Sequence, residues 1–101
     1  MKIYISGPMT GYPGFNIPAF KDAERALRAL GHEVLNPARQ GADPAKTWAD
    51  YLRADLLDVV AADAVALLPG WEASRGARLE VHVAHALGMT TLPIERWEAD
   101  R

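Results

Sequence analysis

Residues 63–88, with the sequence DAVALLPGWEASRGARLEVHVAHALG, read as an apolar strand, a loop and a helix. If the helix begins at Gly76 and turns by about 100° per residue, its apolar residues form one broad face. This face consists of Ala77, Leu79, Val81, Val83, Ala84 and Leu87, and the polar stripe opposite it consists of Arg78, His82 and His85. Glu80 falls inside the apolar face. It is therefore an acid at a position where an apolar side chain is expected.

The chain has 101 residues and a mass of 11.0 kDa, which predicts one domain over residues 1–101. Its formal net charge is −2 and its Lys and Arg residues are scattered, so we expect no nucleic-acid polymer as a partner. The sequence has no leader-like start and no apolar run approaching about 18 residues, which predicts a cytoplasmic protein without a membrane segment.

The sequence contains few residues that could bind a metal ion. It contains no cysteine, which excludes disulfides, thiolate nucleophiles and Cys-ligated zinc. The three histidines are His32, His82 and His85, and the last two belong to the polar stripe described above. A solvated stripe is the simpler interpretation of that pair, so we expect no metal site.

Strands and helices alternate along the chain. We predict strands at residues 2–6, 32–35, 64–68 and 90–94, helices between Asn16 and Gly31, at residues 46–61 and from Gly76 onward, and an irregular cap at residues 95–101. Asn16 is the candidate N-cap of the first helix. Residues 7–14 and 39–45 are rich in Gly, Pro and polar residues and read as surface loops.

This order predicts an α/β fold. Right-handed crossovers would give a single three-layer domain, in which a parallel sheet of four to five strands carries helices on both faces, as in flavodoxin-like and Rossmann-like proteins. Ligands bind such sheets at the carboxyl ends of the strands. Three segments should meet there: residues 7–15, the segment after Asn36, and residues 69–75.

The second helix carries another misplaced acid. Its apolar stripe consists of Trp48, Tyr51, Leu52, Leu56, Val59 and Val60. Asp55 follows Trp48 by seven residues and Tyr51 by four, which puts it near the middle of that stripe. Asp50 and Asp58 point away from the stripe and read as solvated charges. Asp55 and Glu80 are therefore both predicted to face the interior near the binding edge of the sheet.

A buried carboxylate needs a partner, a proton or a polar cavity. Each acid could instead be exposed through a different helix phase, or could pair with a buried hydroxyl or with Arg53 or Arg75. Because two such acids lie near one edge, the functional interpretation is favoured. A carboxylate pair is the minimal equipment for glycosyl chemistry, in which one group attacks the anomeric carbon and the other handles the proton of the leaving group.

Several motifs carry a family resemblance that spans nearly the whole chain. They are the opening IYISGPMTG, the N-x-x-x-F motif followed by LGHEVLNPA, the aspartate of YLRAD, and the closing S-R-G-A-R-L-E-x-x-x-A-x-A-L-G. The sequence resembles the nucleoside 2-deoxyribosyltransferase-like superfamily, in particular a small bacterial and phage branch catalogued only as a domain of unknown function. The resemblance implies that Glu80 is the nucleophile, that Asp55 contacts the base and manages its proton, and that Tyr4 orients the nucleophile. An apolar first strand would also accept Tyr4 as a core residue.

The resemblance also implies a set of sugar or phosphate contacts: Gly7, Thr10, Gly11, Ser74, Arg75 and Gly76. Ser74 matches a serine near the 5′-phosphate in nucleotide-acting relatives, where nucleoside-acting ones have an aspartate, and it is equally suited to be a helix N-cap. Thr10 stands where the nucleotide hydrolases have an arginine, a loss for which Arg75 could compensate at its helix N-terminus. The nature of the 5′ group is left open.

Together these features predict cleavage or transfer of an N-glycosidic bond in a small-molecule nucleoside or nucleotide, without a metal or organic cofactor. Attack by water would make the protein a hydrolase, and attack by a second base a transferase. A non-catalytic nucleotide-sensing module and an NAD-directed glycohydrolase are the alternatives. The resemblance further implies a homodimer or larger homo-oligomer.

Overall fold

The computed structural model describes residues 1–99 as a four-stranded parallel sheet with helices on both faces. The strands are β1 (Lys2–Ser6), β2 (Glu33–Leu35), β3 (Ala64–Leu67) and β4 (Thr90–Pro93), in the order β2-β1-β3-β4. The helices are α1 (Ile17–Ala29), α2 (Trp48–Ala61), α3 (Arg75–Ala86) and α4 (Ile94–Ala99), with short 3₁₀ helices η1 (Pro13–Asn16), η2 (Pro37–Gln40) and η3 (Trp71–Ala73). The predicted α/β fold is confirmed.

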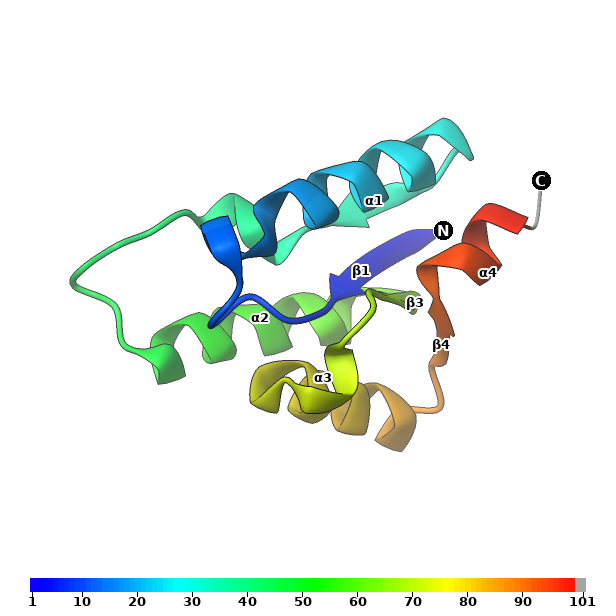
Figure 1. Ribbon diagram of the computed structural model, residues 1–101. Helices are drawn as coiled ribbons and strands as arrows, with labels where there is room; N and C mark the ends of the chain where they lie inside the picture. Colours follow the sequence, from blue (N-terminus) through cyan, green and yellow to red (C-terminus); the bar gives the residue numbers. More distant parts are fainter. Residues whose placement is uncertain (100–101) are drawn as a thin grey trace.

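Two cores lie on opposite faces of the sheet. In Figure 1, α1 lies on one side of the strands and α2 and α3 on the other. The α1 side buries residues of β1, α1 and α4, including Ile3, Ile5, Phe20, Leu27 and Trp97. The α2 and α3 side buries Tyr4, Val59, Val65, Leu67, Val81 and Ala84. Because side chains alternate along a strand, Tyr4 and Ser6 face α3 while Ile3 and Ile5 face α1.

The buried stripes of the helices are narrower than the sequence suggested. In α3 the buried residues are Ala77, Glu80, Val81 and Ala84, so the predicted inward position of Glu80 is confirmed. Leu79 and Leu87 are exposed, however, as are Trp48 and Val60 of α2. The broad faces predicted for both helices were wrong at these four positions, because only the residues spaced three and four apart reach the sheet and the neighbouring helix.

Two local predictions were wrong. Asn16 does not cap α1 with its side chain: it adopts a left-handed conformation, with φ of 61°, and donates to the carbonyl of Pro8 instead. Residues 94–99 are not irregular, because they form α4, with Ile94 and Trp97 buried and the Trp97 indole donating to the carbonyl of Leu92. The last two residues of that predicted cap lie outside the described residues.

The other helix starts are capped by side chains. Thr47 and Asp50 form a reciprocal capping box at α2, and Ser74 accepts from the backbone N–H of Ala77 at α3. Asp50 is thus an exposed capping residue, whereas Asp58 is half-buried rather than solvated. In residues 1–99 no helix has the length and apolar character to cross a membrane.

Candidate active site

Glu80 is held at the base of a cavity by two hydroxyl groups. Its side chain leaves the first turns of α3 toward the sheet and is only 5% exposed. Tyr4 Oη donates to Glu80 Oε2 at 3.0 Å, and Ser6 Oγ donates to Glu80 Oε1 at 2.8 Å. Both donors come from β1, two residues apart, so the period of the strand points them to the same side. Each carboxylate oxygen of Glu80 therefore has one fixed donor.

The polar groups next to Glu80 are the two hydroxyls and the carboxyl of Asp55, and within residues 1–99 Glu80 forms no ion pair. Burial raises the pKa of Glu80 above its ordinary value, the Ser6 and Tyr4 hydrogen bonds oppose this shift, and the charge of Asp55 adds to it. Burial, followed by the charges of Glu80 and Asp55, also raises the pKa of the Tyr4 phenol well above its ordinary value. Tyr4 therefore stays a hydrogen-bond donor at physiological pH.

Asp55 is the second acid of the cavity. It is half-buried on α2, and Gln40 Nε2 donates to its Oδ1 atom. Burial raises the pKa of the Asp55 carboxyl, while its interaction with Glu80 and, to a smaller extent, the hydrogen bond from Gln40 work against that rise. The other amide atom, Gln40 Oε1, is buried without a hydrogen-bond partner among the described residues. Because the two acids influence each other's titration, their protons belong to the pair.

Both acids line one cavity of about 650 Å³ at the carboxyl ends of the strands. Its walls come from residues 7–17, 37–42, the first half of α2 and residues 70–80. Four aromatic side chains line it: Tyr12, Phe15, Trp48 and Tyr51. The volume and the mixture of apolar walls with a few polar groups are typical of sites for small organic molecules.

One wall is built from the start of α3. The Arg75 guanidinium lies 4.2 Å from the centre of the Trp48 ring, a cation–π contact that joins the first residues of α2 and α3. Ser74 and Gly76 line the cavity beside this pair, as do Gly7 and Thr10 of the first loop. Gly7 also permits close packing, since a Cβ there would lie 2.6 Å from Leu68 Cβ. Gly11, predicted as a contact, stands outside the lining and is exposed.

Comparison with known proteins assigns a family. Residues 1–92 match the family model described as Domain of unknown function (DUF4406). The chain belongs to this family. A search of curated protein sequences found no significant match.

The DUF4406 domain also matches a solved structure, a 2-deoxyribosyltransferase from the psychrotolerant bacterium Bacillus psychrosaccharolyticus. The TM-score is 0.72 and the sequence identity 22%, and the match covers 91% of this chain and 71% of that chain. At this identity the match establishes a shared fold.

Of the structural alternatives for the two acids, pairing with buried hydroxyls is the one found at Glu80. In this DUF4406 domain the helix phase of Glu80 is right, and its partners are the buried hydroxyls of Tyr4 and Ser6. Arg75 contacts Trp48 and Arg53 is exposed. Within residues 1–99, no three His, Asp or Glu side chains gather where they could hold a metal ion.

Sequence analysis missed two polar residues of this site. Ser6 carried a usable signal, because it lies two residues after Tyr4 on the same strand and therefore on the same face. Gln40 carries none, because it lies in a polar segment whose sequence is typical of a surface loop. It instead ends η2, which turns its amide back toward α2.

Proposed function

We propose that this domain cleaves or transfers the N-glycosidic bond of a nucleoside or nucleotide, with Glu80 as the nucleophile. The observation that carries the proposal is a buried carboxylate at a ligand-sized cavity whose two oxygens are fixed by hydroxyls and form no ion pair among residues 1–99. Such a group is oriented for attack and is not neutralised by an ion pair. The shared fold with a 2-deoxyribosyltransferase supports the same reaction class.

The proposed reaction has two steps. A carboxylate oxygen of Glu80 bonds to the anomeric carbon while the bond from that carbon to the base nitrogen breaks, and the departing base takes a proton from Asp55. Water or a second base then attacks the same carbon, returns its proton to Asp55 and releases Glu80. Tyr4 and Ser6 hold the carboxylate in both steps.

The acid pair shares its protons, and the proposed reaction needs the proton on Asp55, whereas the unliganded site favours it on Glu80. The attacking Glu80 has to be ionised and Asp55 has to be protonated, so activity should fall on both sides of an optimum. In the unliganded site burial raises the pKa of Glu80 more than that of Asp55. Hydrogen bonds from Tyr4 and Ser6 favour the ionised form of Glu80, which eases transfer of the shared proton toward Asp55 when substrate binds.

Gln40 supports a nitrogenous base as the leaving group. Its Oε1 atom is buried beside Asp55 and has no partner among the described residues. A buried acceptor without a partner is costly, and an N–H of a nucleobase would satisfy it. We assign the sugar and its 5′ group to Gly7, Thr10, Ser74, Arg75 and Gly76. Arg75 would favour a phosphate there, so the substrate panel must include nucleotides.

We also propose that the domain forms a homo-oligomer. Leu57 and Val60 of α2 and Leu79 and Leu87 of α3 are exposed on the two helices that cover one face of the sheet. A subunit contact over these helices would cover these exposed apolar side chains. Sedimentation velocity at micromolar concentration should give a dimer or larger species, and a monomer over the whole range would contradict the proposal.

The decisive experiment is a substrate panel followed by chromatography. Deoxynucleosides, ribonucleosides, their monophosphates and NAD are incubated with the protein, with and without adenine as an acceptor, beside Glu80→Gln. Released or exchanged base that disappears in the variant supports the proposal and names the substrate. Ligand binding by both proteins without turnover of any substrate would instead identify a nucleotide-binding module.

A further inference from the structure

Two adjacent side chains of η2 form hydrogen bonds with two different acids. Arg39 reaches Glu24 on α1, and Gln40 reaches Asp55 on α2. The 3₁₀ helix itself has only four residues, and one turn of this kind has little stability of its own. Its position, and with it the aim of Gln40, must therefore come from contacts outside the turn.

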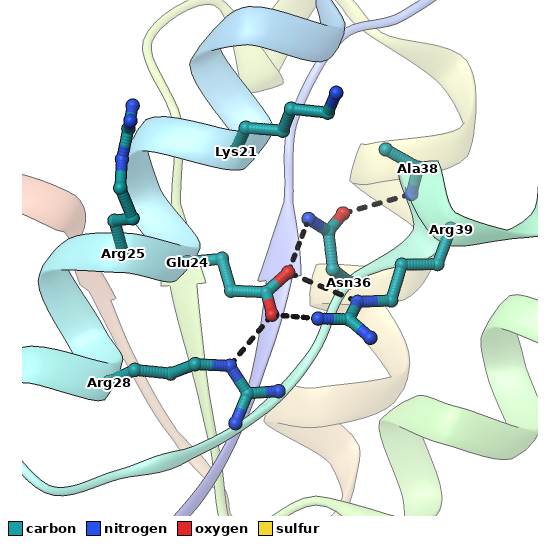
Figure 2. A pocket seen from close by; sticks show the side chains of 7 residues that line it. All are labelled: Lys21, Glu24, Arg25, Arg28, Asn36, Ala38 and Arg39. Carbon is teal, nitrogen blue, oxygen red and sulfur yellow. Dashed lines mark hydrogen bonds and ion pairs between the residues drawn. The ribbon is translucent and has the colours of Figure 1, made fainter.

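Those contacts form a cluster of Glu24, Arg28, Asn36 and Arg39, shown in Figure 2. Glu24 is 8% exposed and accepts from Arg28 Nε at 2.7 Å, from Asn36 Nδ2 at 3.0 Å and from Arg39 Nε at 3.2 Å. A second bond to Glu24 comes from Arg39 Nη2. Partial burial alone would raise the pKa of Glu24, but these hydrogen bonds outweigh it and lower the pKa to about 2.

The cluster holds η2 at two points. Asn36, the residue before the turn, donates to Glu24 and accepts from the backbone N–H of Ala38 at 2.9 Å. Arg39, the third residue of the turn, binds Glu24 through two nitrogens. Both ends of the segment that precedes Gln40 are thus tied to one carboxylate of α1. Arg28 binds the same carboxylate but belongs to α1 itself, so it does not fix η2.

We propose that Arg39 is a positioning residue: its bonds to Glu24 fix η2 so that the Gln40 amide donates to Asp55. The catalytic meaning of this inference rests on the proposed function, in which Asp55 supplies the proton to the leaving base. The positioning itself is a property of the unliganded protein and can be measured without turnover.

The proposal has a measurable consequence at Asp55. The Gln40 bond favours the ionised form of Asp55, so losing it should raise the Asp55 pKa. The titratable groups that face Asp55 are Glu80 from α3, Tyr4 from β1 and Asp58 from its own helix. None of these belongs to η2, so apart from the charge of Arg39, which Arg39→Lys retains, a change in η2 reaches Asp55 through Gln40.

The test is an NMR titration of the Asp55 side-chain carboxyl in four single variants and one double variant of the full chain. Gln40→Met removes the amide that donates to Asp55, and Arg39→Met removes the hydrogen bonds to Glu24. Arg39→Lys keeps the positive charge but cannot form both of those hydrogen bonds. Arg28→Met, which removes the other arginine bound to Glu24, is the matched control. We expect the first three to raise the Asp55 pKa by about one pH unit each. Arg28→Met should change the Asp55 pKa by no more than about a quarter of that shift. The double variant Arg39→Met/Gln40→Met should raise the Asp55 pKa no further than either single variant does, because both substitutions act on the same hydrogen bond.

Two results would overturn the proposal. One is an unchanged Asp55 titration in Arg39→Met while Gln40→Met shifts it, which would mean that η2 holds its place without Arg39. The other is an equal shift of the Asp55 pKa in Arg28→Met and Arg39→Met with no shift in Arg39→Lys, which would mean that the positive charge acts on Asp55 and the geometry of Arg39 does not. Arg39 is exposed, so its variants should fold, and a urea melt checks this. If the protein turns over a substrate, the alkaline limb of kcat should move with the Asp55 pKa while KM stays within about twofold.

Discussion

Glu24 and Glu80 are both buried glutamates on the inner face of a helix, yet their surroundings differ in kind. Glu24 on α1 meets two guanidinium groups and an amide, and its pKa is lowered to about 2. Glu80 on α3 meets two hydroxyls and a second acid, Asp55, and burial together with the charge of Asp55 raises its pKa. Cations make the first carboxylate a permanent anion that ties segments together. Without a neighbouring cation, the Glu80 carboxyl keeps a proton that can titrate.

This difference separates a structural acid from a candidate catalytic one. A carboxylate bound by two arginines is held ionised and fixed in place, whereas an uncompensated buried carboxylate costs stability and is common at functional sites. The cavity follows the same division, because Glu80 lines it and Glu24 does not.

The largest expected difference concerns turnover. Glu80→Gln keeps the size of the side chain but removes the attacking oxyanion, so turnover of the substrate found in the panel should fall by about a thousandfold or more. Glu24→Gln should lower it by about tenfold at most, because it touches no reacting atom. Initial rates of base release measure both variants, and comparable losses would contradict the division of roles.

Removing the two hydroxyl donors tests whether they control the ionisation of Glu80. Tyr4→Phe and Ser6→Ala each remove one hydrogen bond to the carboxylate, so each should lower kcat by about 10- to 100-fold. Both changes favour the protonated acid, so the acidic limb of the pH–rate profile should move to higher pH. A profile that kept its shape in both variants would show that the hydroxyls do not control the ionisation of Glu80.

Substituting Glu24 should mainly change the free energy of unfolding. Glu24→Gln weakens the bonds to Arg28 and Arg39, and we expect a loss of about 2 kcal/mol in the free energy of unfolding at pH 7. Glu80→Gln should instead gain about 2 kcal/mol at pH 8, because a neutral amide replaces a carboxylate that is costly to bury. Urea unfolding measures both, and a loss in each variant would erase the contrast.

The two effects should depend on pH with opposite signs. A lowered pKa contributes stability that is full above the unfolded value of 4.5 and disappears as pH falls toward about 2, so the Glu24→Gln deficit should vanish over that interval. A raised pKa costs stability as pH rises above 4.5, so the Glu80→Gln gain should grow from there upward. Unfolding midpoints from pH 2.5 to 8.5 test both trends, and parallel curves would be incompatible with either assignment.

The sequence predicted the fold and both acids of the cavity because each follows from a short-range period. Alternating strands and helices determine a parallel sheet, and the spacing from Trp48 and from the apolar residues of α3 turns Asp55 and Glu80 inward. The same spacing turns Glu24 inward, since Phe20, Ala23, Glu24 and Leu27 form the buried stripe of α1. Periodicity therefore marks a buried acid without revealing its role.

The partners that reveal the role come from elsewhere in the chain. Arg39 and Gln40 lie in a segment that reads as a polar loop, and only the docking of η2 between α1 and α2 gives each an acid. The broad apolar faces failed for the same reason, because the width of a buried stripe depends on how closely neighbouring elements approach.

The most direct test of the central claim is a search for the glycosyl-enzyme itself. The protein is mixed with the substrate found in the panel, quenched in acid within milliseconds to seconds, digested and analysed by mass spectrometry. We predict one sugar per chain, attached to the peptide that contains Glu80 and missing in Glu80→Gln. Continued turnover with no adduct on that peptide, or an adduct on a different residue, would contradict Glu80 as the nucleophile.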